Sequence, residues 1–261
     1  MTGKDFVWLH LRDLPYFRAM LRAVEASFYQ EYPLPRPVLD LGCGDGHFAS
    51  LTFAAPLEIG LDPGNGPIRK ARRAGAYLHL IQGDAGCMPF EDSFFASALS
   101  NSVLEHIPHI DAVLGETGRV LKTGGRFLFC VPNPRYLSEL SIAGILSRVG
   151  LQRLGHIYTQ WFRRMSRVQH ADWPETWQAR LEKAGFQLEK WWHYFSPQAL
   201  RALELGHYFG APTLLPYILM RRWIIAPFHW NLTLTERYVR RFTTPARDPH
   251  GTFTFFVAYK A

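Results

Sequence analysis

Residues 38–47 hold the feature that most limits what this chain of 261 residues can fold into. The apolar run Val38-Leu-Asp-Leu41 leads directly into glycines at positions 42, 44 and 46. Glycine adopts the positive φ angles of tight turns, and its missing Cβ lets a ligand approach the backbone. A helix that follows such a turn directs N–H groups at the ligand. The segment therefore predicts a buried strand, a ligand-binding turn and a helix, which together begin an α/β sheet.

Short apolar runs separated by turn residues repeat this pattern along the chain, with amphipathic stretches between them. Strands that alternate with helices indicate a parallel sheet covered on both faces, so we expect a doubly wound α/β fold. The predicted strands are 37–41, 57–61, 77–82, 94–100, 126–131, 186–195 and 252–260, and the predicted helices are 6–32, 111–121, 174–184 and one that begins near residue 46.

Composition excludes several classes of protein. Apolar residues make up 48% of the chain and charged residues 20%, which is the balance of a globular protein. Three scattered cysteines are too few for a disulfide framework, and no metal-ligand spacing occurs, so we expect no metal site. A secretory signal is not recognisable, and the apolar stretch 211–228 is interrupted by Arg221 and Arg222. We expect a cytoplasmic protein without a membrane-spanning helix, and leave contact with the inner membrane surface open.

The net charge of +7 comes from two segments. Residues 134–173 contain six arginines and two acids, and residues 196–250 contain seven arginines and three acids. The rest of the chain is therefore close to neutral. Because the guanidinium group binds phosphate and carboxylate through paired donors, we expect an anionic partner near these segments: a substrate, a lipid surface or a nucleic acid.

Acidic residues follow the second and third predicted strands. Asp62 lies 22 residues after Asp40, where an acid holds ribose hydroxyls in dinucleotide folds. That role fits any adenosine ligand, so Asp62 does not separate a nicotinamide cofactor from S-adenosylmethionine. Asp84 can accept a hydrogen bond from the exocyclic amine of adenine. Together with the G-x-G-x-G spacing, it favours S-adenosylmethionine.

These features resemble the class I S-adenosylmethionine-dependent methyltransferases, in particular the small-molecule group with the L-D-x-G-C-G-x-G signature, found here at residues 39–46. The resemblance covers residues 36–133, including Ser100-Asn-Ser-Val-Leu-Glu-His-Ile107 and the stretch from Glu116 to Gly125, and more loosely residues 170–195. It implies a seven-stranded, mostly parallel sheet whose last strand is antiparallel. The implied donor is S-adenosylmethionine, and the product is S-adenosylhomocysteine.

The resemblance also implies which residues hold each part of the donor. The turn after the first strand would frame the methionine moiety, the end of the second strand would hold the ribose, and the third and fourth strands would end near the adenine and the sulfonium. In that order, the implied residues are Asp40, Gly42, Cys43 and Gly44; Asp62 with Pro63; Asp84 with Ala85; and Asn101.

We expect a single methyltransferase domain over residues 1–261, with two segments longer than the family needs. Both border the carboxyl ends of strands, where ligands bind in open α/β sheets, so we expect them to build the acceptor pocket. The expected parts are an N-terminal helical segment 1–35, the donor-binding half 36–133, an insertion 134–173, the rest of the sheet at 174–195 and 251–261, and a helical cap insertion 196–250.

An oxygen acceptor needs a base to remove its proton, whereas a neutral amine or a stabilised carbanion needs little more than alignment. We predict His106 and His109, just past the fourth strand, as candidate catalytic bases. His156, Tyr158 and His170 in the first insertion are further candidates. Helix capping and packing is the alternative role for His106, and positioning of the following helix is the alternative for His170. The sequence does not separate O-, N- and C-methylation.

The expected function is methyl transfer to a small hydrophobic or amphipathic acceptor, lipid-like or anionic. Residues 211–230 combine large apolar and aromatic side chains with arginines. Three interpretations of this segment stay open: a cap over the active site, a peripheral membrane contact or an oligomer interface. An RNA methyltransferase and a non-catalytic adenosine-ligand-binding protein are the alternatives. The chain lacks an RNA-binding module and the Asn/Asp-Pro-Pro-Tyr motif of DNA amino-methyltransferases, so we expect no DNA partner and disfavour RNA. The oligomeric state is not predicted.

Overall fold

The computed structural model describes residues 4–220 and 222–261, which form two compact units. The first, here called the sheet unit, comprises residues 32–134, 166–193 and 253–261. The second, the helical unit, comprises the described residues of 1–31, 135–165 and 194–252. Each unit is described by itself below.

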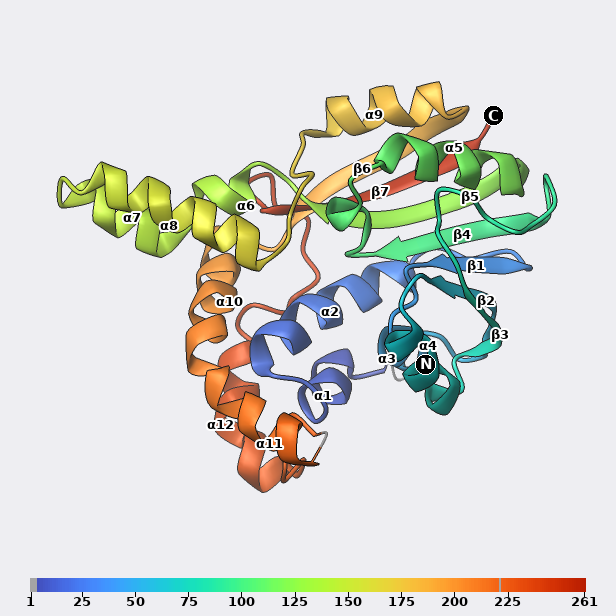
Figure 1. The fold of residues 1–261 in the computed structure, drawn as a ribbon. Coiled ribbons are helices and arrows are strands. Elements are labelled where there is room, and N and C mark those ends of the chain that lie inside the picture. Colours follow the sequence, from blue (N-terminus) through green and yellow to red (C-terminus); the bar gives the residue numbers. More distant parts are fainter. Residues whose placement is uncertain (1–3, 221) are drawn as a thin grey trace. The chain divides into compact units, whose positions relative to one another are not determined.

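A seven-stranded sheet with the order β3-β2-β1-β4-β5-β7-β6 dominates the fold (Figure 1). Strands β1 to β5 pair in parallel, and β7 runs antiparallel to β5. The predicted doubly wound, mostly parallel sheet with an antiparallel last strand is therefore confirmed. The strands are β1 (Val38–Leu41), β2 (Leu57–Asp62), β3 (Tyr77–Gln82), β4 (Phe95–Asn101), β5 (Leu121–Pro132), β6 (Phe186–Tyr194) and β7 (Phe253–Lys260).

Burial follows the position of each strand in the sheet. All four residues of β1 are buried because β1 lies at the centre with helices on both faces. Several residues of β3 are exposed because β3 is an edge strand. In Figure 1, α5 (Ile110–Val120) and α9 (Pro174–Lys183) cover one face, and α3 (His47–Thr52) and α4 (Asn65–Ala74) lie on the other.

The core between the sheet and α9 is aromatic. The ring of Trp177 on α9 lies 5.4 Å from Phe129 on β5 and 6.2 Å from Phe256 on β7. All three side chains are fully buried. Complete burial of one large side chain contributes about 1.5–3 kcal/mol, so this cluster fixes α9 on the sheet.

Strand β5 begins earlier than the prediction of 126–131. Leu121 pairs with Phe95, and Arg126 pairs with Ser97, so residues 122–125 form an irregularity opposite β4. Gly124 supplies a positive φ of 75° there. The glycines interrupt the pairing with β4 but do not end the strand. From the sequence alone, these glycines were interpreted as a turn before the strand.

The helical unit contains the other α-helices of the described residues. The single helix expected over residues 6–32 is wrong: α1 ends at Leu11 and α2 begins at Tyr16, because Pro15 has no N–H to continue the hydrogen bonding. Within the ranges 4–220 and 222–261, no helix is long and apolar enough to cross a membrane. The elements are α1 (Phe6–Leu11), α2 (Tyr16–Tyr29), α6 (Arg135–Ser138), α7 (Ser141–Arg148), α8 (Gln152–Met165), α10 (Pro197–Phe209), η2 (Ala211–Thr213), α11 (Leu214–Met220) and α12 (His229–Val239); η1 (Leu104–His106) belongs to the sheet unit.

Two glycines one turn apart on α5 test how tightly this helix packs. A Cβ added to Gly118 would lie 2.4 Å from the carbonyl oxygen of Ala184, whereas a Cβ on exposed Gly115 would meet nothing within 4 Å. We expect Gly118→Ala to lower the free energy of unfolding by about 1–3 kcal/mol through this clash. Gly115→Ala should raise it by about 0.5–1 kcal/mol, because alanine favours the helix. Urea unfolding of both variants measures the difference, and equal effects would contradict the packing described here.

Candidate functional site

The glycine turn after β1 is fixed by hydrogen bonds to the end of β2. The N–H groups of Gly42 and Cys43 donate to the carbonyl oxygen of Leu61 at 2.8 and 3.0 Å. Gly42, Gly44 and Gly46 all have positive φ, between 57° and 74°. A Cβ on Gly42 would lie 2.4 Å from a methyl group of Val103, so this position also requires glycine for space.

Asp62 at the end of β2 connects this turn to the start of α4. Its carboxylate accepts hydrogen bonds from the N–H of Gly44 at 3.1 Å and from the N–H of Gly64 at 2.8 Å. The side chain is half-buried, and Pro63 beside it is exposed. A carboxylate has about four lone-pair directions, so Asp62 can accept further hydrogen bonds from ligand hydroxyls.

Asp40 lies beneath the turn. The side chain is 4% exposed, and its carboxylate accepts a hydrogen bond of 2.6 Å from the phenol of Tyr77 on β3. Burial raises the pKa of Asp40 to about 7; the Tyr77 hydrogen bond opposes this rise, and the charge of Asp62 adds to it. Tyr77 was not predicted from the sequence, where its only signal is an aromatic residue at the start of the third strand.

Cys43 is buried in the same turn. Burial raises the pKa of its thiol, and the nearby charges of Asp40 and Asp62 raise it further. A thiol held protonated in this way is a poor nucleophile, so Cys43 serves the packing of the turn and does not supply a thiolate.

The loop after β3 carries Asp84 and Ala85. Asp84 is exposed, and its carboxylate accepts a hydrogen bond from the N–H of Gly86 at 2.8 Å. Two residues of α5 hold the rest of the loop: Glu116 accepts from the N–H of Met88 at 2.7 Å, and Arg119 donates to the carbonyl oxygens of Met88 and Phe90 and to Asp92. Both residues lie in the stretch from Glu116 to Gly125, whose sequence did not indicate this role.

The end of the fourth strand carries the last of the residues predicted to bind the methyl donor. Asn101 ends β4, and its side-chain oxygen accepts a hydrogen bond of 3.3 Å from the thiol of Cys130. The hydroxyl of Ser100 donates to the carbonyl oxygen of Leu41 at 3.0 Å, which ties β4 to β1. The residues predicted to bind the donor therefore lie at or just past the carboxyl ends of four adjacent strands, β3, β2, β1 and β4.

The predicted bases His106 and His109 lie in different surroundings within the sheet unit. His106 Nδ1 lies 3.1 Å from the carbonyl oxygen of Arg167, and Nε2 lies 3.7 Å from the Glu105 carboxylate. Burial lowers the pKa of His106, so the ring is neutral near pH 7. His109 is exposed and precedes α5 as its N-cap residue.

The further candidate bases divide between the units. His170 Nε2 lies 3.0 Å from the carbonyl oxygen of Ile107, which gives this histidine a positioning contact in the sheet unit. His156 and Tyr158 belong to α8 of the helical unit. There the Tyr158 phenol donates to Glu204 at 2.8 Å.

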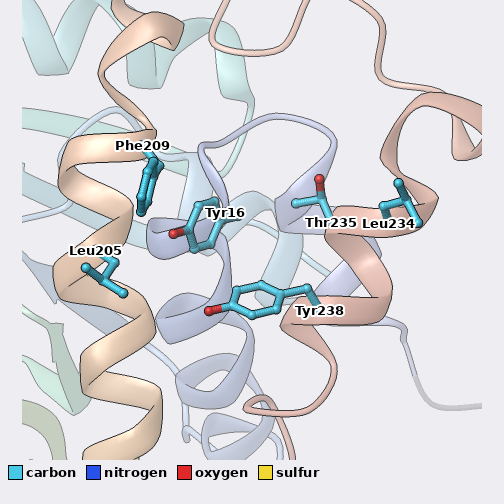
Figure 2. Close-up of a pocket in the computed structure, with 6 residues that line it drawn as sticks. All are labelled: Tyr16, Leu205, Phe209, Leu234, Thr235 and Tyr238. Carbon is cyan, nitrogen blue, oxygen red and sulfur yellow. The ribbon is translucent and has the colours of Figure 1, made fainter.

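A groove of about 460 Å³ occurs inside the helical unit. Side chains of α10 and α12 face the ring of Tyr16 on α2 across it (Figure 2). The lining is mainly apolar, and the volume lies within the range of about 300–1,000 Å³ that is typical of small-molecule sites. The lining residues are Tyr16, Leu205, Phe209, Leu234, Thr235 and Tyr238.

The buried carboxyl of Asp40 predicts a pH-dependent stability. Between pH 4 and 7 the folded state keeps a proton that the unfolded chain has lost, so the free energy of unfolding falls as the pH rises through this window. Asp40→Asn removes this effect. The free energy of unfolding of the variant, minus that of the native protein, should therefore increase by roughly 2–4 kcal/mol from pH 4 to pH 8. Denaturant titrations of the ligand-free protein measure this, and Asp45→Asn, an exposed carboxyl of the same turn, is the matched control. A pH-independent difference would contradict the burial of Asp40.

Comparison with known proteins identifies the sheet unit. Residues 39–129 match the family model described as "Methyltransferase domain". The fatty-acid O-methyltransferase of Mycolicibacterium smegmatis is 39% identical over 104 residues, 38% of each chain. The malonyl-[acyl-carrier protein] O-methyltransferase of Methylococcus capsulatus is 36% identical over 117 residues, 42% of each chain. Both alignments thus span about two fifths of the relative.

One solved structure is similar in fold to this chain over most of its length. The SAM-dependent methyltransferase of Thermotoga maritima superposes with a TM-score of 0.55 and 18% identity, over 94% of this chain and 91% of the other. At that identity the likeness concerns the fold. Together with the glycine turn and the sheet order, these findings mean that residues 39–129 match a methyltransferase domain and that the chain has the fold of a SAM-dependent methyltransferase.

Proposed function

We propose that this protein transfers the methyl group of S-adenosylmethionine to a small amphipathic or lipid-like acceptor. The observation that carries the proposal is the position of the Asp62 carboxylate beside the Gly44 N–H, at the carboxyl end of the central strands. Ligands of open α/β sheets bind at this edge, and an acid there accepts hydrogen bonds from ribose hydroxyls.

The shape of the turn fits an adenosine ligand. A Cβ on Gly44 would meet only the carbonyl oxygen of Gly42, at 4.0 Å, so the space above this backbone is open. Asp62 would hold the ribose with Pro63 beside it, and Asp84 with Ala85 would bound the adenine. Asp40, Gly42, Cys43 and Gly44 would frame the methionine moiety, with the buried Asp40 acting through the backbone of the turn. Asn101 would approach the sulfonium end. The bound donor supplies an electrophilic methyl group on its sulfonium sulfur.

The chain's residues serve the transfer chiefly by alignment, which supplies a large share of the acceleration in a two-substrate displacement. For an oxygen acid such as a carboxylate, the acceptor is already ionised near pH 7 and needs no base. His106 and His109 remain our candidate bases for other acceptors. Because the His106 ring is neutral near pH 7, it is in the form that accepts a proton.

The lipid-like acceptor is supported by two independent observations. The curated relatives named above act on a fatty acid and on a carrier-bound malonyl group, both of which are carboxylates on acyl chains. The groove of the helical unit has the apolar lining and the volume that suit an alkyl chain. We propose that this groove binds the alkyl chain of an acyl ligand.

The peripheral membrane contact through residues 211–230 is part of this proposal. Large apolar side chains of this segment, including Leu219 and Trp230, are exposed. Arg222 is exposed as well, and Arg221 lies outside the described residues. A cytoplasmic location at the inner membrane surface would give the enzyme access to an acyl acceptor.

The alternatives of RNA methylation and of non-catalytic adenosine-ligand binding predict no methylation of acyl acids.

Filling the groove tests the acceptor proposal. Transfer of labelled methyl groups from S-adenosylmethionine to free fatty acids of increasing chain length measures activity. We expect Thr235→Trp to raise the KM for long-chain acids about tenfold, by occupying the space of the alkyl chain, and to leave kcat and donor affinity unchanged. The matched control is Thr233→Trp, an exposed position of the same helix outside the groove lining. Absence of methyl transfer to any acyl acid, or equal KM effects of both variants, would contradict the proposal.

A further inference from the structure

We propose that the hairpin formed by α7 and α8, residues 141–165, is a docking element for the surface of an anionic lipid bilayer. This segment differs in sequence from residues 211–230, although both belong to the helical unit, whereas the residues predicted to bind the donor belong to the sheet unit. The inference therefore stands or falls independently of methyl transfer.

The exposed face of the hairpin is apolar. Five large side chains on or just before α8 recur every three or four residues, which places them along one side of the helix. They are Leu151, Leu154, Ile157, Trp161 and Met165, each 37–53% exposed. Ile145 on α7 and Val149 at the tip add to this surface at 52% and 65% exposure. No side chain of α7 is buried. An apolar surface of this extent is characteristic of an interaction site.

The charge of the hairpin indicates the chemistry of its partner. Residues 141–165 contain four arginines and no aspartate or glutamate. Arg153 precedes Ile157 by four residues and Arg164 follows Trp161 by three, so both guanidinium groups border the apolar stripe. Both residues are exposed. Arginines beside an apolar face with a tryptophan match an interfacial helix whose rings enter the headgroup region while its cations meet lipid phosphates.

The base of the hairpin is anchored, so its tip is presented on a rigid support. Glu204 of α10 is fully buried and accepts hydrogen bonds from the N–H of Ser141 at 2.7 Å and from the Tyr158 phenol at 2.8 Å. The carboxylate thereby caps the start of α7 and holds the middle of α8. Phe162, fully buried, lies against the ring of Tyr136 at 5.8 Å.

The two helices are also closely packed against each other. A Cβ added to Gly155 would lie 3.0 Å from the carbonyl oxygen of Ala143, so glycine permits the close approach of α7 and α8. Gly150, with φ of 84°, forms the turn between them, and the N–H of Leu151 donates to the carbonyl oxygen of Leu146. A rigid element loses little conformational entropy when it binds, which favours docking of a preformed surface.

Flotation of the full-length protein with lipid vesicles tests this inference. The vesicles are phosphatidylcholine alone, or phosphatidylcholine mixed with phosphatidylglycerol, at low and physiological salt. Arg153→Glu combined with Arg164→Glu reverses the charges that border the stripe, and Leu154→Gln combined with Ile157→Gln removes apolar surface at unchanged charge. The matched control is Arg72→Glu combined with Arg73→Glu on α4, which makes the same charge change at exposed positions of the sheet unit. Circular dichroism and binding of S-adenosylhomocysteine verify that each variant is folded.

We expect the native protein and the α4 control to float with anionic vesicles only, and both hairpin variants to bind at least tenfold more weakly. Equal losses in the control and in the arginine variant would mean that net charge alone drives binding, and would overturn the inference. Normal flotation of both hairpin variants, or no flotation of the native protein, would overturn it as well. A native dimer that the apolar variant converts to a monomer, without vesicle binding, would assign the surface to a second copy of the chain instead. Flotation without methyl transfer would contradict only the proposed function.

Discussion

The hydrogen bonds from Gly44 and Gly64 to the Asp62 carboxylate are the interaction on which the candidate site depends. They join the glycine turn after β1 to the loop after β2, and so set the distance between the backbone that we propose faces a donor and the acid that we propose holds its ribose. The parallel sheet makes this possible, because parallel neighbours end at the same edge. A change in the register of β1 and β2 would separate these groups.

The site's carboxylates perform different tasks because their surroundings differ. Asp40 is buried under the turn with Tyr77, and its pKa is raised to about 7. Asp84 is exposed on a loop that Glu116 and Arg119 hold from α5. The buried acid therefore supports the turn, and the exposed one is available to a ligand.

Much of the sheet could be predicted from local patterns, and little of the helical unit could. Buried parallel strands are short apolar runs between turn residues, so the seven strands were found within a few residues of their ends. The hydrogen-bond partners that support these elements were not predicted, because they are distant in sequence. Tyr77 is 37 residues from Asp40, and Glu204 is 63 residues from Ser141. Pairs at such separations have no local signal. Pro15 is a local signal for the start of a new helix, and the prediction of a single helix over residues 6–32 neglected this signal.

The residues predicted to bind the methyl donor lie at one edge of the sheet because of the strand order. No such rule places the predicted bases. Each of these residues lies near the carboxyl end of a strand or just past it, and strand order alone brings these ends to one edge. Histidines on loops and helices have no comparable rule. His106 makes a backbone contact with Arg167, and His156 belongs to the other unit.

Calorimetric titration with S-adenosylhomocysteine and with NADH tests the central claim, that the glycine turn and Asp62 bind a methyl donor. We expect binding of S-adenosylhomocysteine and no binding of NADH. The Asp62→Asn variant should bind S-adenosylhomocysteine about tenfold more weakly or worse, because a hydrogen bond to a charged group is lost. Glu91→Gln, which neutralises an exposed acid of the same unit, should bind like the native protein. Binding of NADH with S-adenosylhomocysteine ignored, or an Asp62→Asn variant that binds as tightly as the native protein, would contradict the account.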